Sequence, residues 1–238
     1  MTITSPHNEK LKQIRKLSRR RRQRAQLQRF VAEGEDLLAA ADAAGWVALE
    51  RYCASGSGLE GAEVEPKLLD SVSGLGSGTR ALAVYEERWE PAPRGPICVY
   101  LHGIHDPGNV GAVLRSAQAF GASSVALGPG SADPYGPKAV RASMGAVFAV
   151  PLARTTEIGE LPGARIALVA DSGVPLQELH GAGFEQITLL VGGEREGLPD
   201  ELVAGADHVA AIPIRTHSLN AAMAATVALY EVTRMARE

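Results

Sequence analysis

The chain has 238 residues, of which 45% are hydrophobic, and a formal net charge of −3, so it can form a full core without covalent staples. Its two cysteines, Cys53 and Cys98, lie far apart on apparent strands, which indicates reduced thiols in a cytoplasmic protein rather than a disulfide framework. The apolar runs are too short to span a membrane, and no secretory signal is evident. We expect a cytoplasmic protein with no membrane partner.

The net charge conceals a strong asymmetry. Residues 1–30 contain ten Lys or Arg residues and one acid, Glu9, whereas the rest of the chain contains 14 basic and 26 acidic residues. A basic segment on an acidic body indicates a polyanionic partner such as RNA, although a solvated helix face would give the same pattern. The side chains expected to contact RNA are Arg19, Arg20, Arg21, Arg22 and Arg24.

The first part of the chain predicts a small α/β domain over residues 1–90. Residues 1–9 are expected to be disordered, and residues 10–28 to form a basic helix with a thin apolar stripe. A proline-rich linker over 91–96 ends the domain. The other elements expected here are strands at 30–34, 46–52 and 81–85 and helices at 35–44 and 65–69.

A glycine motif, GLGSG, occupies residues 74–78 and superficially matches a nucleotide-binding loop. Such a loop should leave a buried strand and open a helix. This motif instead follows a predicted helix and precedes a predicted strand. The context therefore disfavours a nicotinamide-dependent oxidoreductase, the alternative enzyme class that the motif suggests.

Residues 97–127 predict a strand, a loop, a helix and a second strand, the unit that builds a parallel α/β sheet. Apolar residues recur at helical spacing from 110 to 120. Asn109 is the predicted N-cap of this helix, and Gly121 stands where its C-terminal glycine is expected. A second domain should therefore begin at residue 97 and extend to 238.

Arg115 is a candidate functional residue of that helix. It lies four residues after Gly111, on the same face, and its side chain leans back toward the first helical turn. Its guanidinium can therefore join the free N–H groups of that turn in an anion site. An exposed arginine on a solvated face is the alternative.

Further strands are expected at 147–151, 166–170, 187–191 and 208–213, with a short helix at 138–145. The glycine-rich turn at 192–199 directly follows one of them. Ligands of α/β sheets bind at the carboxyl ends of strands, which makes this turn a candidate binding loop.

The last helix begins near Ser218, a plausible N-cap. Its apolar stripe of Leu219, Met223, Val227 and Tyr230 predicts packing on both sides. The partner is either the core of the same chain or a second copy of it, and the pattern favours neither.

Three blocks of sequence carry a resemblance to a known family. They are DPGNVGAVLRSAQAFGA (106–122), LLVGGEREGLPDEL (189–202) and IPIRTHSLNAAMAATVALYE (212–231). In this order they resemble the motifs of the SpoU, or TrmH-like, branch of the SPOUT RNA methyltransferases. The resemblance covers residues 97–238, and residues 10–90 resemble more weakly the small RNA-binding domain that often precedes it.

The resemblance implies a parallel α/β sheet with a deep trefoil knot, S-adenosylmethionine as the cofactor, and a homodimer. The implied reaction is methylation of a ribose 2′-hydroxyl, most naturally in ribosomal RNA, with transfer RNA as an alternative substrate. The positions matching the family's cofactor site are Leu190, Gly192, Ile212 and Leu219. Those matching its catalytic site are Arg115, Asn109, Glu194, Ser218 and Asn220.

The chain departs from the family at residues 214–217, where four residues replace the usual six and no glycine occurs. A catalytically weak RNA-binding or assembly factor with the same fold is therefore a further alternative. Glu194 has a structural alternative too, since its carboxylate can accept amides of its own turn. A metal site at His102, His105 and Asp106 is disfavoured because no further ligand is evident.

Overall fold

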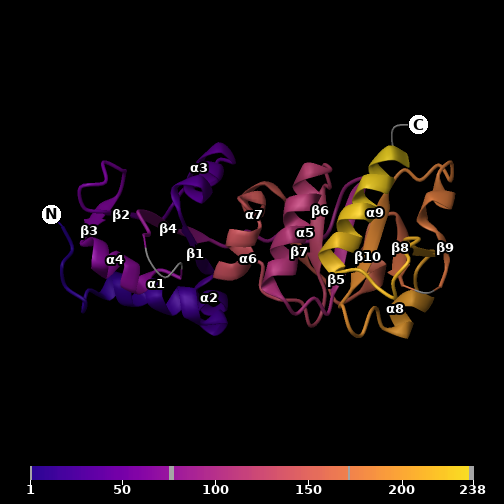
Figure 1. Ribbon diagram of the computed structural model, residues 1–238, viewed down its shortest axis with the longest axis horizontal. Coiled ribbons are helices and arrows are strands. Elements are labelled where there is room, and N and C mark those ends of the chain that lie inside the picture. The colour runs from indigo at the N-terminus through magenta and orange to yellow at the C-terminus, as the bar shows by residue number, and fades with distance from the viewer. Residues whose placement is uncertain (1, 75–77, 171, 236–238) are drawn as a thin grey trace. The chain divides into compact units, whose positions relative to one another are not determined.

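The computed structural model describes residues 2–74, 78–170 and 172–235, so residues 75–77 of the GLGSG motif lie outside the described residues. The chain forms two compact units, which Figure 1 shows as a ribbon. One comprises Met1–Glu87 with Asp133–Ala149, and the other Arg88–Ala132 with Val150–Glu238. The sequence analysis assigns residues 133–149 to the second domain, whereas in the structure they pack with the first unit.

The first unit contains a four-stranded sheet of order β1-β4-β2-β3, in which only β2 and β3 pair in parallel. The expected strand at 147–151 is wrong. Residues 146–149 are helical and bury apolar side chains, and a short apolar run does not by itself distinguish a helix from a strand. The strands are β1 (Arg29–Glu33), β2 (Glu50–Ala54), β3 (Ala62–Val64) and β4 (Ala81–Glu86), and the helices are α1 (Glu9–Arg19), α2 (Arg21–Leu27), α3 (Glu35–Ala43), α4 (Pro66–Val72), α6 (Pro137–Ala142) and α7 (Ala146–Ala149).

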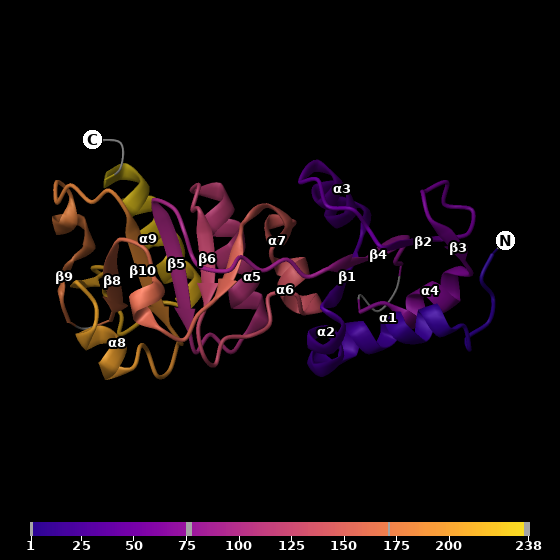
Figure 2. The same cartoon turned by 180° about the vertical axis from the view of Figure 1, so that it is seen from behind.

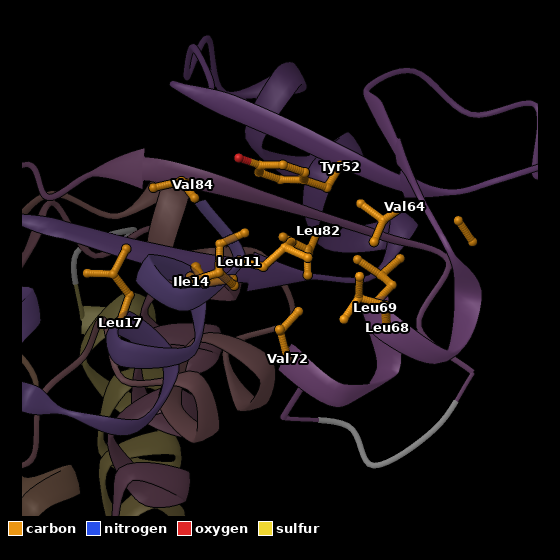
Figure 3. Close-up of a cluster of buried hydrophobic side chains, with 12 residues drawn as sticks. Leu11, Ile14, Leu17, Tyr52, Val64, Leu68, Leu69, Val72, Leu82 and Val84 are labelled. Carbon is orange, nitrogen blue, oxygen red and sulfur yellow. The ribbon is translucent and has the colours of Figure 1, made fainter. Parts of the chain in front are cut away.

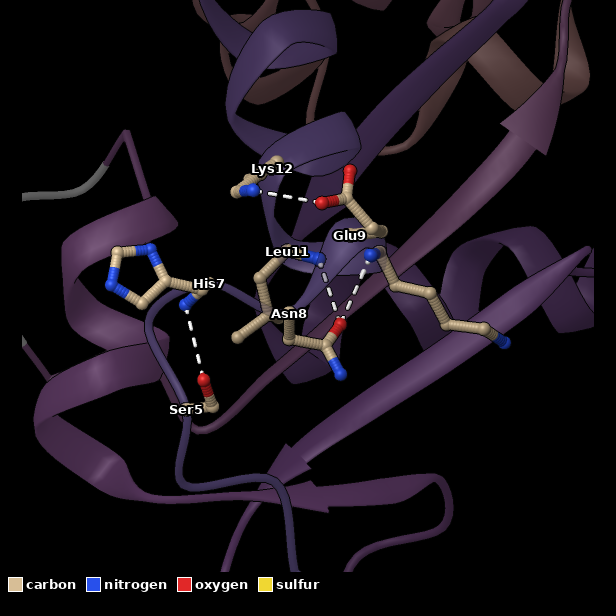
Figure 4. Close-up of polar contacts among 7 residues, drawn as sticks. Ser5, His7, Asn8, Glu9, Leu11 and Lys12 are labelled. Carbon is tan, nitrogen blue, oxygen red and sulfur yellow. Dashed lines mark hydrogen bonds and ion pairs between the residues drawn. The ribbon is translucent and has the colours of Figure 1, made fainter.

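The described residues before α1 are ordered, contrary to the expectation for residues 1–9. Ile3 forms a parallel bridge with Val64, and its backbone N–H donates to Glu63 O at 2.8 Å. Asn8 caps α1, because its Oδ1 accepts the backbone N–H groups of Lys10 at 3.0 Å and Leu11 at 3.3 Å (Figure 4). The basic segment is therefore an integral part of the unit.

Arg24 is not available to RNA, because its side chain is buried in the first unit with 5% exposure. Its Nε and Nη2 donate to Asp133 Oδ2 at 2.9 and 2.7 Å, and its Nη1 donates to Leu17 O at 2.7 Å. A buried charge requires such partners. The prediction of an RNA contact at Arg24 is wrong, whereas Arg19, Arg20, Arg21 and Arg22 are exposed.

Residues 133–149 contribute aromatic side chains to the core of the first unit. Tyr135 and Phe148 pack against Phe30, with ring centroids 4.6 and 5.9 Å away. Trp46 packs edge-on against Phe148 at 5.2 Å, and its Nε1 donates to Phe148 O at 2.8 Å. These contacts fix the segment against β1 and the residues after α3.

The second unit contains a seven-stranded sheet of order β7-β6-β5-β10-β8-β11-β9, and every pair in it is parallel. The predicted parallel sheet is confirmed, whereas β7, β9 and α8 lie outside the elements predicted from the sequence. The strands are β5 (Ile97–His102), β6 (Ser124–Leu127), β7 (Leu152–Arg154), β8 (Ala164–Val169), β9 (Val174–Pro175), β10 (Ile187–Gly192) and β11 (His208–Ala211), and the helices are α5 (Pro107–Ala119), α8 (Asp200–Ala204), α9 (Ala221–Met235) and the 3₁₀ turns η1 (Ile158–Glu160) and η2 (Leu176–Leu179).

Helices α5 and α9 pack side by side against one face of this sheet, in front of the strands in Figure 1 and behind them in Figure 2. Ser116 Oγ lies 2.6 Å from Thr226 Oγ1, and Phe120 meets Tyr230 edge-on. Their N-termini therefore start close to one another. No helix within the described ranges is long and apolar enough to cross a membrane.

An ion pair ties β8 to the residues before β11. Arg165 Nε and Nη2 donate to the Asp207 carboxylate at 2.8 and 2.9 Å, and the Arg165 backbone N–H donates to it at 2.8 Å. The hydrogen bonds from Arg165 lower the pKa of Asp207 to about 2.

Candidate active site

Helix α5 begins at Pro107, and Asp106 is its N-cap because the Asp106 Oδ1 accepts the Gly108 N–H at 2.7 Å. The predicted cap, Asn109, lies within the first turn instead, so that prediction is wrong. Gly121 has φ +71°, as expected for the C-terminal glycine. Because Asp106 supplies the cap, the Asn109 side chain is free to make other contacts.

Helix α9 begins at Ala221, and its N-cap is Asn220 rather than the predicted Ser218. The Asn220 Oδ1 accepts the N–H groups of Ala222 at 3.0 Å and Met223 at 3.2 Å. Because the oxygen must face the helix, the amide nitrogen Nδ2 points the other way. Asn220 therefore has a fixed orientation with its donor group directed out of the helix.

That donor joins Asn109 and Glu194 in a small hydrogen-bonded network. Asn220 Nδ2 donates to Asn109 Oδ1 at 3.2 Å and also to Glu194 Oε1. Asn109 Nδ2 donates to the same Glu194 oxygen at 2.6 Å. Within the described part of the chain the Glu194 carboxylate therefore bonds the two asparagines, and not amides of its own turn.

The turn that carries Glu194 follows β10 and requires glycine. A Cβ added to Gly192 would lie 2.2 Å from the Gly197 carbonyl carbon, and one added to Gly193 would lie 2.5 Å from Gly103 O. Gly197 has φ +65°, and its N–H donates to Gly193 O at 2.8 Å. These contacts close the turn and hold Glu194 at its tip.

Two cavities meet at this turn. The larger has a volume of about 530 Å³ and lies at the carboxyl ends of β8 and β10. The smaller, of about 350 Å³, is lined by the first residues of α5 and the loop before it. The two share the lining residues Gly193, Glu194, Arg195, Glu196 and Ala221. Glu194 of the network therefore lies at their common boundary, and Asn109 lines the smaller cavity.

The larger cavity contains three of the four positions expected to bind a cofactor, namely Gly192, Ile212 and Leu219. Leu190 does not line it. Leu190 is buried against Tyr100 and Leu198, and its strand pairs with neighbours on both sides.

The sequence analysis missed several residues that line the larger cavity. The shortened loop at 214–217 supplies Ile214 and His217, and the end of β8 supplies Leu168 and Val169. The rule that ligands bind at the carboxyl ends of parallel strands could have indicated the β8 residues.

The remaining predicted catalytic residues lie outside the network. Ser218 is exposed and lines the larger cavity. Arg115 is exposed on α5, and its side chain makes no hydrogen bond or ion pair with the residues that the structure describes. The structure therefore brings together Asn109, Glu194 and Asn220, and leaves Arg115 free.

The histidines near the smaller cavity do not form a metal site. Among residues 2–74, 78–170 and 172–235, no group of three or more His, Cys, Asp or Glu side chains is arranged to hold a metal ion. Burial lowers the pKa of His102, whose Nδ1 lies 3.4 Å from the Tyr100 hydroxyl. His105 and Asp106 line the smaller cavity.

Comparison with known proteins identifies the family. The model of the SpoU rRNA Methylase family matches residues 96–230, which is more than half of the chain. The chain therefore belongs to the SpoU rRNA methylase family. The network joins one residue from each of the three sequence blocks that resemble this family.

Relatives and solved structures agree with this assignment. The chain is 34% identical to ribosomal RNA small subunit methyltransferase G 2 of Syntrophobacter fumaroxidans, over 98% of this chain and 49% of the relative. It is 37% identical to the 23S rRNA (uridine(2479)-2′-O)-methyltransferase of Streptomyces viridochromogenes, over 54% of this chain and 49% of the relative. The matches thus span about half the length of these relatives.

A solved structure is similar over nearly its whole length. The AdoMet-bound rRNA methyltransferase from Sinorhizobium meliloti superposes with a TM-score of 0.88 and 30% identity, covering 98% of this chain and 97% of that one.

Proposed function

We propose that this protein transfers a methyl group from S-adenosylmethionine to a ribose 2′-hydroxyl in ribosomal RNA. The observation that carries the proposal is the Asn109–Glu194–Asn220 network, whose Glu194 lies at the boundary of two cavities. A transfer enzyme needs a donor and an acceptor that meet at one set of polar groups. The names of the relatives support ribosomal RNA rather than transfer RNA as the substrate.

The larger cavity fits the cofactor. Its volume of about 530 Å³ lies within the range of small-molecule sites. Its walls combine apolar side chains, including Ile212 and Leu219, with glycine backbone at 192–193, where a Cβ would clash. This combination suits a flat adenine ring and a polar amino-acid tail. The bound cofactor would supply an activated methyl group.

The smaller cavity is the proposed place of the target ribose. In the transfer, a C–O bond forms to the 2′-oxygen, the C–S bond breaks, and the hydroxyl proton leaves. Glu194 is the candidate acceptor of that proton, because the two asparagines fix its Oε1 at the wall that the two cavities share. Arg115 is proposed to clamp the adjacent phosphate and stabilise the developing alkoxide, since guanidinium remains protonated.

A homodimer is part of the proposal. Met223, Val227 and Tyr230 form a stripe on α9 with exposed fractions of 63, 38 and 48%. An exposed apolar stripe on an otherwise packed helix suits a second copy of the chain. Val227→Glu should halve the mass in solution and reduce activity, and an unchanged mass would argue against this interface.

Two further features are proposed from family membership. They are the trefoil knot and the division into an RNA-binding and a methyltransferase domain. The parallel order of β5, β10, β8 and β11 supports the proposed fold. A cytoplasmic location is supported by the free, buried thiols of Cys53 and Cys98.

Calorimetry with S-adenosylmethionine, followed by mapping of 2′-O-methylation on ribosomal RNA from cells lacking the protein, tests the function. The enzyme should bind the cofactor and a specific methyl group should be lost. Cofactor binding without any lost methyl group would favour a catalytically weak RNA-binding factor. No cofactor binding would reject the proposed enzyme.

A further inference from the structure

Helix α1 and its C-cap residue, Arg20, carry five cations on one side. Lys12, Arg15, Lys16, Arg19 and Arg20 line a shallow surface depression of about 200 Å³. At 3.6 residues per turn, these positions cover about 140° of the helix circumference. The depression is therefore lined only by positively charged side chains.

The opposite face of α1 fixes this helix in place. Leu11, Ile14 and Leu17 are at most 1% exposed, and they pack in the hydrophobic cluster of the first unit (Figure 3). The Asn8 cap holds the first turn (Figure 4). The cations thus project from a rigid surface, and binding a ligand does not require ordering of the backbone.

Three of the five cations are available to a ligand. Lys12 Nζ lies 2.7 Å from Glu9 Oε1, and Arg15 Nη2 donates to Ser71 Oγ at 3.4 Å. Lys16, Arg19 and Arg20 are exposed and make no side-chain hydrogen bond or ion pair with other described residues. Such unpaired charges in a shared depression attract an anion that spans several of them.

The lack of aromatic residues in α1 favours duplex RNA over single-stranded RNA as the bound anion. Proteins that recognise single-stranded RNA stack its bases on aromatic side chains. Neither α1 nor α2 contains an aromatic residue, and Phe30, the next one in the chain, is buried. Lys12 and Arg20 are eight residues apart, about 12 Å along the helix, enough to meet more than one phosphate of a duplex.

We propose that this face of α1 binds the phosphate backbone of double-stranded RNA without reading its sequence. The inference rests on the proposed function in that RNA is the substrate. The contact surface is held in place by the packing of α1 in the first unit, whereas the candidate active site belongs to the second unit. The inference assigns the contact to Lys16, Arg19 and Arg20, with Lys12 and Arg15 beside them.

The test variant is Lys16→Gln/Arg19→Gln/Arg20→Gln in the full-length protein. The control is Lys67→Gln/Arg80→Gln/Arg94→Gln, which removes the same charge from elsewhere on the chain. A charge-keeping variant, Lys16→Arg/Arg19→Lys/Arg20→Lys, shows whether the positions or their charges matter. Affinity is measured between 50 and 200 mM salt, roughly the range over which phosphate contacts show, for a blunt RNA duplex and an unstructured single strand of equal length.

Removing the three α1 charges should weaken duplex binding by on the order of tenfold or more. Each phosphate contact contributes about 0.9 to the slope of log affinity against log salt concentration. Loss of three contacts should therefore flatten that slope by about 2 to 3. The control and charge-keeping variants should stay near wild type. Equal slopes for the α1 and control variants would overturn the proposal, as would an equal loss for the single strand.

Cofactor calorimetry separates this inference from the proposed function. If the wild type binds no S-adenosylmethionine but duplex binding still depends on α1, then the function is wrong and the surface stands. If the cofactor binds and duplex affinity ignores the α1 charges, the surface is wrong and the function stands.

Discussion

The first turns of α5 and α9 both contribute to the candidate active site, but they differ in which side chains cap the helix and which contact Glu194. In α5, Asp106 caps the helix and Asn109 reaches the network. In α9, the single side chain of Asn220 does both, with its oxygen on the helix and its nitrogen on Glu194. Stability and site geometry are therefore separable at α5 and coupled at α9.

The largest expected effect is on activity, at Arg115 of α5, the helix in which capping and site geometry depend on different residues. Arg115→Ala should reduce single-turnover methyl transfer by about 100-fold or more, roughly 3 kcal/mol, the loss typical of a charged donor to the transition state. Melting temperature and cofactor affinity should not change, because the side chain is exposed. Arg115→Lys keeps the positive charge but loses the planar guanidinium, which can donate two parallel hydrogen bonds. A wild-type rate in Arg115→Ala would remove this residue from the mechanism.

Asn220 tests the coupling at α9. Asn220→Ala should lower both activity and the free energy of unfolding, the latter by about 1 kcal/mol, from the lost cap. Asn220→Ser should keep the cap but lose the amide donor, so that only activity falls. Thermal melting and methyl transfer are measured on both variants. If both variants melt like wild type, the cap has no energetic role.

The complementary test concerns α5. Asp106→Ala should lower the free energy of unfolding by about 1 kcal/mol, a shift of roughly 2–4 °C in melting temperature for a chain of this size. Asp106→Ser should restore it, whereas Asn109→Ala should leave stability unchanged and reduce activity. Urea unfolding gives the stabilities. A loss of stability in Asn109→Ala equal to that in Asp106→Ala would show that tasks are not separated at α5.

The smallest effect is expected at Asp207, which contributes to stability outside the site. Its pKa is about 2 in the folded protein, below the ordinary value of 3.8, so its stabilisation is present above about pH 4 and lost as the pH falls through about 2. Asp207 is 41% exposed, so solvent screening limits the pair to about 0.2–1 kcal/mol. Urea unfolding of Asp207→Asn should show this deficit at pH 7 and a much smaller one at pH 2, where Asp207 is about half protonated. A deficit independent of pH would contradict the assignment.

The sequence predicts both helices but not where they begin. Asp106 and Asn109 are equally good cap residues, and Pro107, a residue favoured at the first helical position, decides between them. That signal is present in the sequence itself. Ser218 and Asn220 offer no such local signal, because the choice there depends on a contact with Glu194.

The network itself could not be predicted from local patterns. Its hydrogen bonds join residues that are 85, 111 and 26 positions apart in the chain. The family resemblance indicated these residues, but periodicity and propensity carry no information on such pairs. The order of the first residues escaped prediction for the same reason, since Ile3 pairs with Val64.

Residues 133–149 belong to the first unit, although the residues on both sides of them belong to the second. This arrangement limits where the chain can be cut into fragments. A fragment beginning at Ile97 would carry Tyr135 and Phe148 without Phe30 and Trp46, their packing partners. Those rings would be exposed to water, and the fragment would be prone to aggregate. The second unit of this chain is therefore not one contiguous block of sequence. A recombinant that keeps residues 133–149 of this chain should therefore also carry Phe30 and Trp46.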